Sequence, residues 1–180
     1  MFIAHQLKQQ SMAAYLLYMW RIEDIIRAFN ADINSIDRNV IEPMQLNAEQ
    51  HRQEYEWYES LIDMMHREDV IKAGHIQLVK NILIDLQDCH LRLLQDNKNA
   101  DYISCYYRLL PAITQLKSKT TNPQISDLEM CFVFLYGIMN LRAQHKDISQ
   151  ETEQTATEIT AFVDLLAQRY NTQDIETDDD

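Results

Sequence analysis

The sequence predicts an all-α protein, a single-domain bundle of six or seven helices around a buried central helix near residues 127–144. Three observations support this class. Glycine and proline number only 2 and 3 among 180 residues, whereas hairpins and phosphate-binding loops depend on glycine. Apolar residues recur at helical spacing in each long segment. One segment is apolar on nearly all sides, as a central helix is. β-Sandwiches, Rossmann folds and P-loop enzymes are therefore disfavoured.

The first long helix is expected over residues 12–30, with Ser11 as its N-cap. Residues 2–9 can add a short turn before it. Residues 32–41 are expected to form a short helix that Pro43 ends. Two apolar rows mark the buried side of the first helix: Met12, Leu16, Met19 and Ile26 in one, and Tyr15, Ile22, Ile25 and Phe29 in the other.

The next helix is predicted over residues 48–71, with Asn47 as its cap and two polar turns at its start. Gly74 lies just past its end and is expected to supply the left-handed residue that commonly terminates a helix. Residues 75–95 form a further helix, with His90 on the same face as the leucines. The apolar stripe of the first of these two helices consists of Tyr58, Leu61, Ile62 and Met65.

A helix over residues 99–119 contains Pro111, so that either the helix kinks there or two shorter helices meet. Both alternatives remain open. Ser126 and Glu129 match a capping box at the start of the central helix. Inside that helix, Gly137 would let a neighbouring helix approach closely.

The last helix begins at Ser149 and leads into an acidic end. We therefore expect a helical bundle domain over residues 1–170 and a disordered acidic tail over residues 171–180. The tail carries five carboxylates and no basic residue: Asp174, Glu176, Asp178, Asp179 and Asp180.

Charge and cysteine content limit the partners. The formal net charge is −12 and no three basic residues are consecutive, which disfavours nucleic acid and anionic membranes as partners. Cys89, Cys105 and Cys131 form no CxxC motif and suit buried, reduced thiols. The N-terminus has no apolar core of the length that a signal peptide needs, and the longest apolar run, residues 130–139, is too short to span a bilayer. We expect a soluble, cytoplasmic protein.

Motifs for metal and nucleophilic chemistry are missing. The nearest match to the Glu-x-x-His ligand pair of dimetal bundles is Asp63 with His66, which has no second copy. HxxxH, HExxH and GxSxG do not occur. The sequence therefore predicts neither a metal site nor a cofactor.

A few residues remain as candidates for a site. His90 is either a core histidine bonded to a carbonyl or an acid, or a ligand or general base in a pocket. Glu23, Asp63 and Asp85 are catalytic candidates that also fit an exposed helix face. Aromatic residues that could line a pocket with His90, or simply form core, are Trp20, Trp57 and Tyr58.

Several blocks of the chain resemble an uncharacterised all-helical bacterial family, a domain of unknown function. They are YLLYMWRIED at residues 15–24, WYESLIDMM at 57–65, Gly74-His75 with residues 81–94, and Cys131-Phe132 with Leu135-Tyr136-Gly137. The resemblance covers about residues 1–170. It implies a small cytoplasmic helical protein, with no established activity and no catalytic residues to transfer.

Two functional hypotheses follow. The first is a non-catalytic helical module that binds itself or a protein partner, for which the polar segment 48–56 could serve as a docking surface. The alternative is an enzyme or small-molecule binder with a pocket between helices. That alternative requires the candidate acids and His90 to converge on a cavity of roughly 300 Å³ or more.

Overall fold

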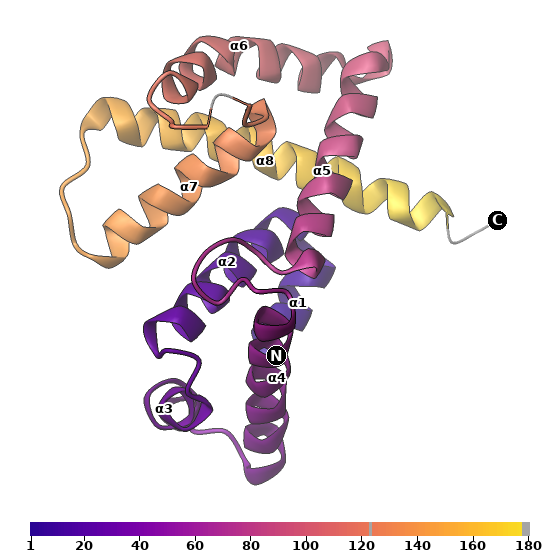
Figure 1. The fold of residues 1–180 in the computed structure, drawn as a ribbon. Helices are drawn as coiled ribbons and strands as arrows, with labels where there is room; N and C mark the ends of the chain where they lie inside the picture. Colours follow the sequence, from indigo (N-terminus) through magenta and orange to yellow (C-terminus); the bar gives the residue numbers. More distant parts are fainter. Residues whose placement is uncertain (123, 178–180) are drawn as a thin grey trace. The chain divides into compact units, whose positions relative to one another are not determined.

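A computed structural model describes residues 1–122 and 124–177 of the chain, with side chains described as far as residue 172. The predicted all-α class is confirmed. The described residues form eight α-helices, joined by short 3-10 and π-helical turns and by loops (Figure 1). The count exceeds the predicted six or seven because residues 2–10, expected to add only a short turn, form a helix of their own.

Within this all-helical domain, residue contacts cluster into two compact units. The first comprises residues 1–10 and 14–82, and the second comprises residues 11–13 and the chain from Leu83 onward. The last helix continues through Thr177, beyond the predicted end of the bundle at residue 170. Residues 178–180 of the predicted acidic tail lie outside the described residues, and the disorder of the tail stays a prediction.

The first unit is built on helices α2 and α4. Asn47 caps α4 as predicted: its side chain accepts from the Gln50 N–H at 2.9 Å, and the Gln50 side chain accepts from the Asn47 N–H at 3.3 Å. Apolar side chains that this unit buries include Leu16, Met19, Ile26, Tyr58, Leu61 and Met65. Its helices are α1 (Phe2–Gln10), α2 (Met12–Ala28), α3 (Ile33–Ile36), α4 (Ala48–Arg67) and the start of α5 (Gln77–Gln95).

Helix α4 ends earlier than the sequence predicted, and a different residue terminates it. Asp69, with φ 54°, takes the left-handed conformation that the sequence assigned to Gly74. The Val70 N–H then reaches back to the Met65 carbonyl at 2.9 Å, which closes the helix. Gly74 has φ +92° but lies farther on, in the loop that leads to α5.

The second unit packs three helices together. Helix α6 (Ala100–Lys117) contacts both α7 (Asp127–Ala143) and α8 (Gln150–Thr177), and α7 contacts α8 (Figure 1). Pro111 lies inside α6, which is one continuous helix, so the alternative of two shorter helices is wrong. Ser126 caps α7, accepting from the Glu129 N–H at 3.0 Å, which is the Ser126 half of the expected capping box.

Helix α7 is the predicted buried helix, and it is buried on all but one side. Its buried residues are Leu128, Met130, Cys131, Phe132, Leu135 and Ile138. Val133 and Leu141 are 42% and 37% exposed, and Gly137 lies between them at four-residue spacing. A Cβ at Gly137 would meet nothing within 4 Å. The expectation that another helix of this chain packs against Gly137 is therefore wrong.

The two glycines make a matched test of the backbone. Gly137→Ala should raise the free energy of unfolding by up to about 1 kcal/mol, because alanine favours a helix interior and has open space there. Gly74→Ala should lower it by more than about 1 kcal/mol, because φ is +92° there. Urea denaturation of both variants measures the two changes, and equal effects would contradict this account.

Candidate functional site

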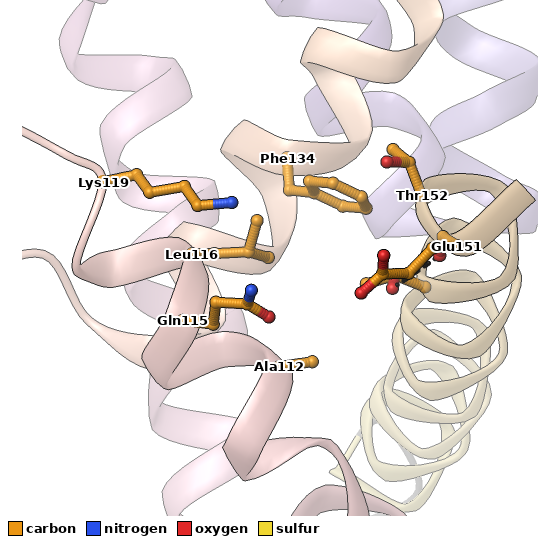
Figure 2. A pocket seen from close by; sticks show the side chains of 8 residues that line it. Ala112, Gln115, Leu116, Lys119, Phe134, Glu151 and Thr152 are labelled. Carbon is orange, nitrogen blue, oxygen red and sulfur yellow. Dashed lines mark hydrogen bonds between the residues drawn. The ribbon is translucent and has the colours of Figure 1, made fainter. Parts of the chain in front are cut away.

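A cavity of about 130 Å³ lies where α6, α7 and the first turns of α8 meet. Figure 2 shows Lys119, Gln115 and Ala112 on one side of the space, with Phe134, Thr152 and Glu151 on the other. The lining residues are Ala112, Gln115, Leu116, Lys119, Phe134, Glu151, Thr152 and Thr155. None of them was a candidate from the sequence, because they come from three consecutive helices and the turn after α6, and no local pattern shows which of their side chains meet.

Some polar groups around this cavity have hydrogen-bond partners within the protein, and others have none among the described residues. Hydroxyls of α8 are already bonded: Thr152 contacts the Ser149 hydroxyl at 2.9 Å, and Thr155 donates to the Glu151 carbonyl at 3.0 Å. Among the described residues, the end groups of Lys119, Gln115 and Glu151 have no hydrogen-bond or ion-pair partner. The cavity therefore combines an ammonium, an amide and a carboxylate, all three on exposed residues, that are available to a ligand.

Two further hollows lie along α8. One, of about 150 Å³, is lined by Cys105, Arg108, Leu109, Glu158 and Ala161. The other, of about 420 Å³, is lined by Arg142, Ala156, Thr157, Thr160, Ala161 and Asp164. In the larger hollow the cation is already engaged, since Arg142 pairs with Glu153 at 2.5 Å, and most of its lining residues are exposed.

Two of the predicted site residues, Trp20 and Glu23, meet in the first unit, and His75 joins them. Glu23 is 1% exposed, and its Oε2 lies 2.5 Å from Nδ1 of His75. Its Oε1 accepts from the Ile76 N–H at 2.9 Å. The Trp20 and His75 rings are stacked, with centroids 4.9 Å apart and planes at 17°. The sequence blocks included Gly74-His75, but a loop histidine carries no periodic signal that would pair it with Glu23.

This cluster holds the loop before α5 against α2. Arg27 donates to the carbonyls of Val70, at 3.2 Å, and of Gly74. Glu68 accepts from the Gln77 N–H at 2.5 Å. Two carboxylates, Glu23 and Glu68, therefore accept hydrogen bonds from the backbone N–H groups at the start of α5. Glu23 is thus a buried structural carboxylate, and it also orients an imidazole whose side chain is 38% exposed.

His90 is buried in the second unit. Its Nδ1 lies 2.6 Å from the Tyr102 hydroxyl, and the edges or faces of Tyr106 and Phe162 surround the ring. Burial lowers the pKa of His90 to about 4, so that the imidazole is neutral at pH 7. His90 is thus a hydrogen-bonded core histidine, but its partner is the Tyr102 hydroxyl rather than the expected carbonyl or acid.

A second polar group lies beside His90. The Tyr106 hydroxyl donates to Asp127 Oδ2 at 2.8 Å, and Lys117 donates to Asp127 Oδ1 at 2.7 Å. Burial by itself raises the pKa of Asp127, but the hydrogen bonds from Lys117 and Tyr106 outweigh it and the net pKa is lowered. Burial also raises the pKa of Tyr106. The network therefore holds a charged carboxylate next to a neutral imidazole.

The other candidates lie apart. Asp63 is exposed and pairs with Arg67 at 3.4 Å, and Asp85 is exposed. Tyr58 is buried and Trp57 half-buried, with ring centroids 5.1 Å apart. Glu23 and Asp63 belong to the first unit, whereas Asp85 and His90 belong to the second. The three hollows described above are lined by other residues.

The polar segment 48–56 is only partly a surface. Glu54 is 2% exposed, and the amino group of Met1 pairs with it. Burial, with a smaller contribution from the nearby Glu54 charge, raises the pKa of the Tyr18 hydroxyl to about 12. On the outer side of the helix, Arg52 pairs with Glu49 at 2.7 Å and with Glu56 at 2.8 Å.

Metal clusters and membrane spans are both absent from the part of the chain that the structure describes. Its side chains contain no group of three or more His, Cys, Asp or Glu placed to hold a metal ion. Its helices include none with the length and apolar character needed to cross a bilayer.

Glu23 and Asp63 make a matched pair of acids for a stability test. Glu23→Ala should lower the free energy of unfolding by about 1–3 kcal/mol, because it leaves the Ile76 N–H without its acceptor. Asp63→Ala should change it by less than about 0.5 kcal/mol, because its ion pair is exposed. Chemical denaturation at pH 7 measures both. Equal losses would show that Glu23 lacks the structural role described.

The buried His90 predicts a pH dependence of stability. The unfolded chain binds a proton at this residue near pH 6.5, the folded chain only near pH 4. Between these values the unfolded state holds more protons, so the free energy of unfolding falls as the pH is lowered, by up to about 1.4 kcal/mol per pH unit. Denaturation between pH 7 and pH 4 should give a shallower dependence for His90→Gln than for the parent chain, and parallel curves would refute this.

Comparison with known proteins gives a family and no activity. No curated protein and no solved structure matches the chain. One family model matches residues 1–177, which is nearly the whole chain and includes both compact units. The resemblance found in the sequence blocks is therefore confirmed, and the chain belongs to the family described as Domain of unknown function (DUF4924).

Proposed function

We propose that the chain is a non-catalytic helical interaction module that binds a second copy of itself through the exposed side of α7. The observation that carries the proposal is the line of Val133, Gly137 and Leu141 on a helix whose other sides are buried. Exposed apolar residues in a continuous line on a rigid helix are a frequent feature of protein interfaces. We call these three residues the α7 line.

The geometry of the α7 line suits an antiparallel pair of identical helices. If the two-fold axis passes Gly137, then Val133 of one copy meets Leu141 of the other, since both lie four residues from the axis. Packed helix axes are about 8–10 Å apart, and a glycine at the crossing allows the lower end of this range. The open space around the Gly137 Cα is available for this approach.

In the antiparallel pair, the charges near the two ends of the α7 line are complementary. Glu129 lies eight residues before Gly137, whereas His145 and Lys146 lie eight and nine residues after it. Among the described residues none of these three has an ion-pair partner. An antiparallel pair brings Glu129 of each copy to Lys146 of the other, and the helix dipoles oppose each other favourably. Parallel packing would instead place like charges together.

The size of the surface sets the expected affinity. One helix per copy contributes less area than the roughly 1,200–2,000 Å² of a stable interface. We therefore expect a reversible dimer with a dissociation constant on the order of micromolar.

The proposed setting is the cytoplasm of a bacterium, as the family resemblance implies. The three cysteines are thiols in the structure, which suits a reducing compartment. The net charge of −12 supports a protein partner rather than nucleic acid or an anionic membrane. The alternative function, an enzyme or small-molecule binder that uses the acids and His90, has less support because Glu23 and His90 are each engaged with partners in their own unit.

A charge exchange tests the self-association. Glu129→Lys should weaken the dimer at least tenfold, because it places an ammonium group against Lys146 of the second copy. The double variant Glu129→Lys, Lys146→Glu restores opposite charges and should recover the parent affinity. Sedimentation velocity over about 1–100 µM measures the dissociation constants.

Two further variants separate association from folding. Glu59→Lys makes the same charge change at an exposed site on α4 and should leave the dimer unchanged. Gly137→Leu should abolish dimerisation without loss of stability, because its side chain projects into open space in the single copy. A parent chain that is monomeric at 100 µM would refute the proposal. So would a dimer that none of these α7 changes affects.

A further inference from the structure

We propose that the cavity between α6, α7 and α8 is a binding site for a small zwitterion of the α-amino acid class. This inference is independent of the self-association, because the lining residues Lys119, Phe134 and Glu151 are not part of the α7 line. It rests on the charges, the apolar surface and the volume that the cavity combines.

Opposite charges face the cavity from its two sides. In Figure 2 the Lys119 ammonium and the Gln115 amide extend from the α6 side, and the Glu151 carboxylate extends from α8. Elsewhere in the second unit, opposite charges that share a space pair directly, as Lys117 with Asp127 and Arg169 with Asp101 do. Lys119 and Glu151 do not pair among the described residues. A molecule with a carboxylate and an ammonium can satisfy both.

Between these charges the surface is apolar. Phe134 of α7 presents its ring to the space, with Leu116 and Ala112 opposite it (Figure 2). An aliphatic side chain on the ligand would bury surface against this ring, while its charged end stays with Lys119 and Glu151. The Phe134 ring also lies within reach of an ammonium, which adds a cation–π contribution.

The volume restricts the size of the ligand. A cavity of about 130 Å³ is below the roughly 300 Å³ of pockets for drug-sized ligands, so that a nucleotide or a peptide does not fit within it. A single amino acid with a small aliphatic side chain is the size class that fills the space and carries both charges.

The experiment uses the full chain and a panel of L-amino acids as probes. Isothermal titration calorimetry up to about 10 mM of each probe should find binding by at least one small aliphatic member. The amide of that amino acid lacks the carboxylate, and its N-acetyl derivative lacks the ammonium. Each should bind at least tenfold more weakly. Amide NMR shifts should be confined to the residues that line the cavity.

Variants locate the site. Lys119→Met and Glu151→Gln should each weaken binding at least tenfold, whereas Lys98→Met and Glu158→Gln, at exposed positions outside the cavity, should leave it unchanged. Circular dichroism at the binding temperature confirms that the variants are folded. The inference is overturned if no amino acid binds below 10 mM, if the two cavity variants bind as the parent does, or if the amide and the N-acetyl derivative bind as tightly as the amino acid.

Discussion

A polar group that leaves water needs a hydrogen-bond partner, and this constraint organises both units. Among the residues that the structure describes, the side chains of Glu23, Glu54 and His90 are buried, and each is engaged. Glu23 joins α2 to the start of α5 through His75 and the Ile76 N–H. His90 joins α5 to α6 through the Tyr102 hydroxyl. Two residues that the sequence offered as catalytic candidates, Glu23 and His90, therefore serve to position the helices.

Helix α7 is constrained by apolar surface rather than by polar groups. A helix that is apolar all round has more surface than two neighbours can cover, and α6 and α8 leave one line uncovered. The uncovered line and the cavity at Phe134 lie on the same element, but they differ in character. The line is apolar and open, whereas the cavity carries unpaired charges from the flanking helices. The two proposed binding events therefore use different chemistry and can be studied separately.

The sequence predicts features that have a local pattern, such as helix positions, and misses contacts between residues that are distant along the chain. Periodicity located α2, α4, α5 and α6, because each has its own apolar stripe, and α7 was located by its apolar residues on nearly all sides. The end of α4 was misplaced because Asp69, rather than a glycine, adopts the left-handed conformation. Local patterns also could not show that Glu54, within a polar stretch, is buried. The pairing of His75 with Glu23 joins residues far apart in the sequence, and the cavity joins three helices, so neither has a local signature.

The burial of Cys131 on α7 has a practical consequence. Burial raises the pKa of this thiol to about 12, so that the reactive thiolate is scarce at neutral pH. Cys89 is likewise buried, whereas Cys105 on α6 is partly exposed and lines one of the hollows along α8. A maleimide dye will therefore attach at one position of the native chain without removal of the other cysteines. Fluorescence from a dye at Cys105 would report the proposed binding events in the second unit.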